Sequence, residues 1–195
     1  MQDNKYLDDL HEIRQMMRKS TLFLSLSGLS GVLAGVYALI GAAVVYKLLQ
    51  HHYLYYPYVI IESKTFKAII AVALLVLVAS VLTAYLFSMR KAKRNGEKLI
   101  TPTAKRAFYN FALPLLTGGA LCILLINNGH YGLLAPMTLI FYGLACVNVS
   151  KYTFGDVHYL GITEIILGLL AVQFSGYGLL FWVLGFGVCH ILYGG

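Results

Sequence analysis

Six long stretches of apolar residues, separated by short polar connections, dominate the pattern of this chain. They cover residues 21–46, 66–89, 107–126, 131–149, 157–174 and 177–193. Each stretch is continuously apolar rather than alternating, which is typical of membrane-spanning helices and not of barrel strands. The pattern therefore predicts an all-α polytopic membrane protein, with six transmembrane helices in one membrane domain over residues 21–195.

A different pattern precedes the first stretch, in a leader over residues 1–20. Leu7, Leu10, Ile13 and Met17 recur at spacings of three and four, and the acidic side chains fall on other faces. This spacing predicts a short amphipathic helix over 3–19 that lies on the cytoplasmic headgroups. A solvated leader is the alternative, because acidic residues weaken attraction to anionic lipid.

Composition agrees with a protein whose main partner is the lipid bilayer. Hydrophobic residues make up 59% of the 195 residues and charged residues 12%, about half of the ~25% that is usual in soluble domains. The formal net charge of +7 does not indicate nucleic-acid binding, because the Lys and Arg residues cluster beside the apolar stretches. Cys122, Cys146 and Cys189 lie in apolar stretches without CxxC spacing, so we expect reduced cysteines, no metal site and no cofactor.

The distribution of basic residues predicts how the chain is oriented. The connection 90–106 and the leader are rich in Lys and Arg, whereas the connections 127–130 and 175–176 carry no charge. Basic connections remain on the cytoplasmic side of a membrane. We therefore expect a multi-pass protein of the bacterial inner membrane with its N-terminus and C-terminus in the cytoplasm.

Small residues line one face of the first stretch. Gly31 and Gly35 form a GxxxG pair, and Ser27, Ala34, Ala38 and Ala42 continue the small-residue spacing. Small residues allow helix backbones to approach closely inside a bilayer. We expect this face to pack against another helix of the same chain, with a homodimer through the face as the alternative.

The fifth stretch has a similar face, and an acidic residue lies in it. Gly161, Glu164, Gly168, Ala171 and Ser175 are separated by three or four residues, so they share one side of a helix. A charged group at membrane depth is costly. We therefore expect Glu164 to face other helices or a cavity, and to be uncharged or closely hydrogen-bonded.

Further polar residues lie at the same predicted depth. Pro114 has no N–H, so it leaves the backbone carbonyl of Asn110 without its helical partner. The predicted topology gathers a polar cluster in the cytoplasmic half of the bundle, formed by Asn110, Asn148, His158, Glu164 and His190. These residues are the candidates for binding or proton relay.

Some short stretches resemble segments of small uncharacterised polytopic bacterial membrane proteins. They run from Leu24 to Gly31, from Val36 to Gly41 and from Tyr159 to Glu164. The resemblance covers a small part of the chain. It implies a membrane protein of that kind, and neither an activity nor a functional residue.

Three functions are compatible with the polar cluster. In the first, a polar cavity binds or passes a small solute, a proton or a lipid, and water reaches Glu164. In the second, the polar groups only hold helices together, alone or beside a protein partner, and Glu164 is dry and fully hydrogen-bonded. The third is an intramembrane metal-dependent hydrolase that uses His158, Glu164 and His190, although the spacing is not that of a known zinc motif. We expect a non-enzymatic role.

Overall fold

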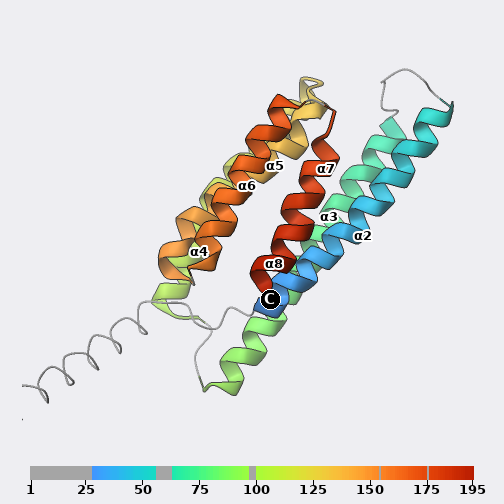
Figure 1. The fold of residues 1–195 in the computed structure, drawn as a ribbon. Helices are drawn as coiled ribbons and strands as arrows, with labels where there is room; N and C mark the ends of the chain where they lie inside the picture. Colours follow the sequence, from blue (N-terminus) through green and yellow to red (C-terminus); the bar gives the residue numbers. More distant parts are fainter. Residues whose placement is uncertain (1–27, 56–62, 97–99, 154, 175) are drawn as a thin grey trace, which may run out of the picture.

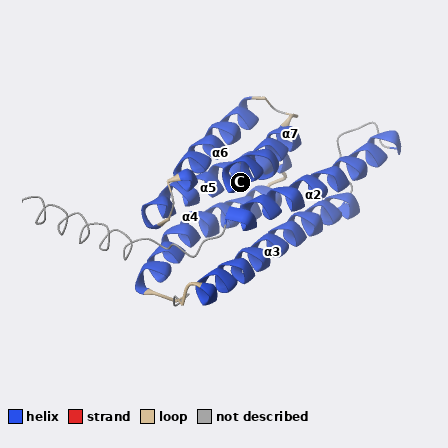
Figure 2. Ribbon diagram, turned by 60° about the horizontal axis from the view of Figure 1, so that its bottom comes forward, coloured by secondary structure: helices blue, strands red, loops and turns tan. Residues whose placement is uncertain are grey.

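The computed structural model describes residues 28–55, 63–96, 100–153, 155–174 and 176–195. Every regular element in these ranges is a helix (Figures 1 and 2). The long elements are α2 (Gly28–Tyr55), α3 (Ser63–Arg94), α4 (Pro102–Asn127), α5 (Leu134–Val149) and α6 (Asp156–Gln173). The last helix consists of α7 (Gly178–Trp182), η3 (Val183–Cys189) and α8 (His190–Gly194), and the short elements η1 (Tyr131–Leu133) and η2 (Ser150–Tyr152) flank α5.

The all-α prediction is confirmed for the described residues, and five of the helices are long and apolar enough to cross a membrane. The final helix, Gly178–Gly194, is apolar but shorter than these five. The structure therefore supports five membrane-spanning helices and leaves the predicted count of six without confirmation. The predicted leader helix over 3–19 lies outside the described residues.

The first helix extends beyond its predicted end. The apolar stretch ends at Tyr46, but α2 continues to Tyr55, so the connection between the first two apolar stretches begins as helix. Lys47, Leu48, Leu49 and Gln50 are good helix formers, and Pro57 is the first residue after Gly41 that would break a helix. Hydropathy marked where the apolar surface ends rather than where the helix ends.

The predicted basic connection 90–106 is also largely helical. α3 continues to Arg94, and Lys91, Lys93 and Arg94 occupy its last turn, where cations interact favourably with the helix dipole. α4 begins at Pro102, because the side chain of Thr101 accepts a hydrogen bond of 3.0 Å from the backbone N–H of Ala104. Only the residues between Arg94 and Pro102 connect the two helices.

The helices form two groups with the C-terminal helix between them (Figure 1). α2 packs along α3, whereas α5 packs along both α4 and α6. η3 and α8 contact α2, and α7 and η3 contact α6. The C-terminal helix therefore joins the hairpin of α2 and α3 to the layer of α4, α5 and α6.

Glycines allow these helices to approach closely. A Cβ atom on Gly143 would lie 2.6 Å from the carbonyl oxygen of Gly161, and a Cβ atom on Gly161 would lie 2.7 Å from the carbonyl oxygen of Gly143. A Cβ atom on Gly168 would similarly lie 3.0 Å from the backbone of α5 at Pro136. The α5 and α6 backbones are thus in direct contact along the small-residue face of α6.

The small-residue face of α2 packs within the chain. A Cβ atom on Gly35 would lie 2.6 Å from the carbonyl oxygen of Gly187, and one on Gly31 would lie 3.4 Å from the Cα atom of Gly194. Both glycines therefore face the C-terminal helix. This arrangement gives the face a partner without a second copy of the chain.

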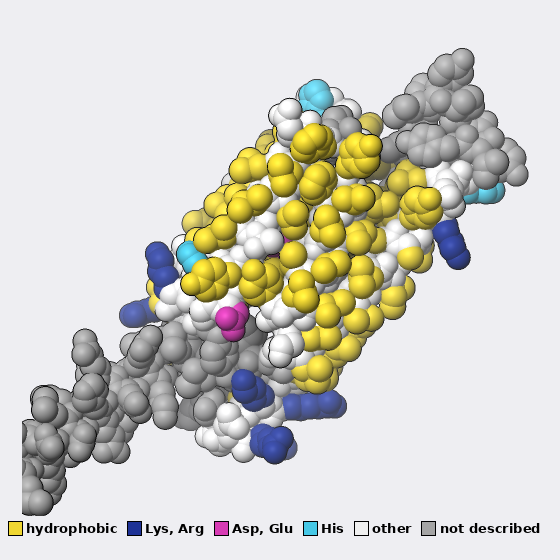
Figure 3. All heavy atoms as spheres, in the orientation of Figure 1, with side chains coloured by type: hydrophobic (Ala, Val, Ile, Leu, Met, Phe, Trp, Pro, Cys, Tyr) yellow, Lys and Arg dark blue, Asp and Glu magenta, His cyan; other side chains and the backbone are white. Residues whose placement is uncertain are grey.

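Apolar side chains cover much of the outer surface. Leu75 of α3 is 69% exposed and Leu116 of α4 is 72% exposed. Figure 3 shows hydrophobic side chains over the middle of one face, with Lys and Arg side chains toward its ends. An exposed apolar band between charged ends is the surface expected of a protein that contacts lipid.

We expect the substitution Gly161→Leu to destabilise the protein by about 1–3 kcal/mol, as overpacking does in other cores. The new side chain would meet backbone atoms of α5, which cannot move aside by changing a rotamer. Gly119→Leu in α4 is the matched control, because no heavy atom lies within 4 Å of a Cβ at Gly119. Thermal unfolding in detergent measures both effects, and equal stability of the two variants would contradict this packing.

Candidate functional site

Glu164 is fully buried, at 0% exposure, on the face of α6 that packs against the bundle. Gly161, Gly168 and Ala171 are also buried on this face, as their shared spacing predicted. Ser175, the last residue of the predicted face, is outside the described residues. The carboxyl group therefore lies among helices, as expected.

Gly185 makes the space that the carboxyl group occupies. A Cβ atom at Gly185 would overlap the Oε2 atom of Glu164 and would lie 2.5 Å from the Cδ2 atom of Leu139. Leu139 is itself fully buried. The carboxyl group is consequently held between an apolar side chain of α5 and the bare backbone of η3.

His190 is the closest ionisable partner of Glu164. Its Nδ1 atom lies 3.5 Å from Oε1 of Glu164 and 3.1 Å from the carbonyl oxygen of Gly185. Because a carbonyl oxygen can only accept, Nδ1 must carry the hydrogen in this arrangement. That hydrogen points to Gly185, so the carboxyl is at ion-pair distance from His190 without being hydrogen-bonded to it.

Tyr142 completes the chain of polar side chains. The hydroxyl of Tyr142 lies 2.7 Å from Nε2 of His190. With the hydrogen of the neutral ring on Nδ1, Nε2 can only accept, so the Tyr142 hydroxyl donates. The order of contacts is thus Glu164, His190 and Tyr142, from α6 through α8 to α5.

The turn that presents His190 is a π-helix, over Val183–Cys189. π-helical turns are rare and frequently occur at functional sites. Gly185 and Gly187 are buried within it, and a Cβ atom at Gly187 would lie 2.5 Å from the Cδ2 atom of Leu39 in α2. The wider turn therefore fits between the Glu164 carboxyl on one side and α2 on the other.

Aromatic rings surround the relay of Glu164, His190 and Tyr142. The Tyr142 ring centroid lies 6.0 Å from that of Phe111 and 5.1 Å from that of Phe186. The Phe186 ring also contacts the His190 ring, with 5.8 Å between centroids. These rings place apolar surface beside the polar side chains, and electrostatic interactions in such surroundings are stronger than in water.

The carboxyl of Glu164 has no hydrogen-bond partner among the described residues, on either oxygen. A buried polar atom without a partner costs about 1–3 kcal/mol, and native proteins contain few such atoms. The expectation of a dry and fully hydrogen-bonded Glu164, which a purely structural role requires, is therefore wrong in its second half. Glu164 is also fully buried, so the described residues do not form the water-accessible cavity at Glu164 that was expected for the binding or passage of a solute.

The remaining members of the predicted polar cluster form two separate contacts. The side-chain amide of Asn148 donates to the backbone carbonyl of Asn110 over 2.8 Å, which is the acceptor that Pro114 leaves without a helical partner. His158 contacts the hydroxyl of Ser150 over 3.3 Å at the start of α6. Asn110 and Asn148 thus join α4 to α5, and His158 joins α6 to η2.

The structure accordingly divides the predicted cluster into three parts. Glu164 and His190 are together, Asn110 and Asn148 are together, and His158 lies with Ser150. Across the described residues, no three His, Cys, Asp or Glu side chains are grouped so that they could hold a metal ion. His158, Glu164 and His190 are therefore not assembled in the way that the alternative hydrolase requires.

Sequence reasoning missed Tyr142 and Gly185. Tyr142 is one of 15 tyrosines, and nothing in its neighbourhood along the chain marks it as a partner of His190. The sequence offers a weak indication for Gly185, because two glycines, Gly185 and Gly187, precede His190 within five residues of an apolar stretch. Both residues act through contacts between helices that are distant in sequence.

Comparisons of the chain with protein-family models, with curated proteins and with solved structures found no match. The evidence on function comes from the polar side chains described above.

We expect Glu164→Met to unfold at the wild-type temperature or above it, because an apolar side chain of similar shape removes an unsatisfied carboxyl. Asn148→Leu is the comparison, since it removes a donor that is paired and should cost about 1 kcal/mol. Thermal unfolding in detergent measures both variants. A larger loss for Glu164→Met than for Asn148→Leu would mean that the carboxyl stabilises the fold.

Proposed function

We propose that this chain is a six-span protein of the bacterial inner membrane that binds and passes protons through Glu164, His190 and Tyr142. The observation that carries the proposal is the unpaired, fully buried carboxyl of Glu164 beside the His190 ring. The proposal selects the proton from the wider class of small solutes, because the relay is enclosed by aromatic and aliphatic side chains.

The burial of the pair favours a single shared proton. A lone carboxylate or a lone imidazolium in an apolar site is costly, whereas a neutral pair and a mutual ion pair both carry no net charge. Glu164 and His190 can exchange these two forms by moving one proton between Oε1 and Nδ1. The 3.5 Å between these atoms requires only a small side-chain movement to reach hydrogen-bond distance.

Proton movement through the relay uses both nitrogens of His190. A proton passes from the Tyr142 hydroxyl to Nε2 as the proton on Nδ1 passes to a Glu164 carboxylate. The Tyr142 O–H and His190 Nδ1–H bonds break, and the His190 Nε2–H and Glu164 Oε1–H bonds form. The resulting phenolate recovers a proton from outside the relay. After Glu164 has released its own proton, the His190 ring turns over, so that the hydrogen on its other nitrogen again points to the carbonyl of Gly185 and the relay is ready for the next proton. Histidine suits this role because each of its nitrogens can gain or lose a proton near neutral pH.

The proposed orientation rests on the ends of the described helices. Seven basic residues lie near one end of the bundle: Arg90, Lys91, Lys93, Arg94, Lys105, Arg106 and Lys151. The start of α2 and the C-terminus lie at this same end, since Gly28 is adjacent to Gly194. Lys47, Lys64 and Lys67 lie toward the other end. The positive-inside rule favours the more basic end as cytoplasmic.

The length of the last helix allows a sixth span. The 17 residues of Gly178–Gly194, at ~1.5 Å each, extend about 26 Å, which is at the short limit for a membrane-spanning helix.

Labelling of single cysteines tests this topology in a variant without Cys122, Cys146 and Cys189. A cysteine at Asn95 should react with a membrane-impermeant maleimide only from the cytoplasm, and one at Asn128 only from outside. Asn95 follows α3, and Asn128 follows α4 at the opposite end. Reaction of Asn95 from the outside would overturn the proposed orientation.

Proton flux into liposomes that contain the purified protein and a pH-sensitive dye tests the relay. Glu164→Gln should abolish the flux, because an amide of similar shape cannot carry a proton. Tyr142→Phe should lower the flux by about a hundredfold, which is typical when a group that transfers protons is lost. His158→Gln is the matched control and should retain the wild-type rate, since His158 contacts Ser150 instead.

Two results of the flux experiment would contradict the proposal. Wild-type flux in Glu164→Gln would exclude Glu164 as the proton carrier. Wild-type liposomes that leak protons no faster than empty liposomes, with an imposed pH difference of either sign, would exclude passage altogether. Size-exclusion chromatography of each variant confirms that the fold is retained.

A further inference from the structure

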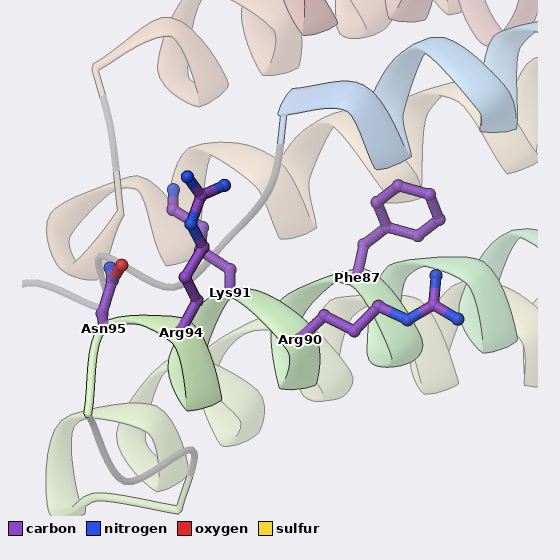
Figure 4. Close-up of a pocket in the computed structure, with 5 residues that line it drawn as sticks. All are labelled: Phe87, Arg90, Lys91, Arg94 and Asn95. Atoms are coloured by element: carbon purple, nitrogen blue, oxygen red, sulfur yellow. The ribbon is translucent and has the colours of Figure 1, made fainter.

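A second site lies at the end of α3, away from Glu164. Figure 4 shows an open pocket there, lined by Phe87, Arg90, Lys91, Arg94 and Asn95. Its volume is about 520 Å³, within the range of about 300–1,000 Å³ that is usual for ligand pockets. Among the described residues that line it, three are basic and none is acidic, so the ligand that it suits is an anion.

The positions of these side chains follow from the helix. Residues three or four apart share a helix face, which brings Phe87, Arg90, Lys91 and Arg94 to one side of the last turns of α3. The side chains of Lys91 and Arg94 extend close together in Figure 4, with Asn95 beside them. The Arg90 guanidinium carbon lies 5.9 Å from the centre of the Phe87 ring, which holds the charge beside an apolar wall.

The two arginines suit a phosphate group in particular. The planar guanidinium group donates two parallel hydrogen bonds to phosphate oxygens. The amide of Asn95 supplies a further donor. A phosphate therefore finds both charge and directed donors in this pocket.

One row of side chains leads from an apolar part of α3 to the pocket. Leu82 and Leu86 are exposed and lie eight and four residues before Arg90, so they continue the row of Arg90 and Arg94 on the helix surface. α3 has 32 residues, which at ~1.5 Å each is about 48 Å, longer than the ~30 Å hydrocarbon core. The last turns of α3 thus reach the headgroup layer when its apolar part spans the core.

We propose that this pocket binds the phosphate headgroup of an anionic membrane lipid, whose acyl chains lie along the exposed side of α3. A soluble phosphate ester offers the same anion, but it has no acyl chain to place against Leu82 and Leu86. The inference requires that α3 spans the bilayer, and it is independent of the proton relay. The lipid phosphate would therefore contact the basic end of α3, and the acyl chains would contact its preceding apolar turns.

Native mass spectrometry of the full chain in detergent, with equal amounts of phosphatidylglycerol and phosphatidylcholine, tests the proposal. The wild-type protein should retain phosphatidylglycerol preferentially. The double variant Arg90→Gln/Arg94→Gln should lose roughly thirty-fold in affinity, because each cation near an anionic headgroup contributes about fivefold. Both arginines are exposed, so their replacement should leave the fold intact, and the single variant Arg94→Gln carries the test with about a fivefold loss.

The matched control is Lys105→Gln/Arg106→Gln, which removes the same charge from the same end of the bundle. Both side chains are exposed and neither lines the pocket. This control should keep the wild-type preference for phosphatidylglycerol. Equal losses in the two double variants would mean that general electrostatics, and not the pocket, retains the lipid, and would overturn the proposal.

A second arm separates a lipid from a soluble phosphate ester. Glycerol phosphate at tenfold excess over phosphatidylglycerol should not displace the lipid from the wild-type protein, because it lacks the acyl chains. Displacement would assign the pocket to a soluble phosphate ester and would overturn the lipid proposal. Arg90→Lys/Arg94→Lys should recover part of the affinity, since it restores the charge but not the paired hydrogen bonds.

Discussion

The direct contact of helix backbones at glycine positions is the constraint on which the rest of this structure depends. Gly143 and Gly161 place α5 against α6, and Gly35 and Gly187 place α2 against the C-terminal helix. Lipid provides little hydrophobic drive for helix association, so close van der Waals packing must supply it. The same close packing brings the backbone of Gly185 and the ring of His190 against the Glu164 carboxyl.

That closeness has a consequence for the buried carboxyl. Backbone and aliphatic side chains fill the space around Glu164, which leaves neither carboxyl oxygen with a hydrogen bond to a described residue. Asn148, in contrast, donates a hydrogen bond from α5 to the backbone of α4. A polar group that stabilises packing acts as Asn148 does, whereas a buried carboxyl without partners is the observation on which the proposed proton relay rests.

The ends of the helices provide a different environment from their centres. α3 carries Lys91, Lys93 and Arg94 in its last turn, beyond the apolar turns that face outward. Its length allows that turn to reach the headgroup layer, where long cationic side chains meet anionic groups at lower desolvation cost. One helix thus combines an exposed apolar surface, the basic turn on which the proposed orientation rests, and the pocket for which a phosphate ligand is proposed.

The sequence by itself determined the features that depend on local spacing. Continuous apolar stretches predicted an all-helical protein, repeats of three and four placed Glu164 on a buried face with Gly161 and Gly168, and Pro114 predicted the free carbonyl of Asn110. Only the tertiary structure decided which helices are neighbours. It paired Glu164 with His190, brought in Tyr142, separated His158 and introduced the π-helical turn at Gly185. Periodicity reports which side of a helix is buried, but the partner on that side depends on contacts between residues far apart in the chain.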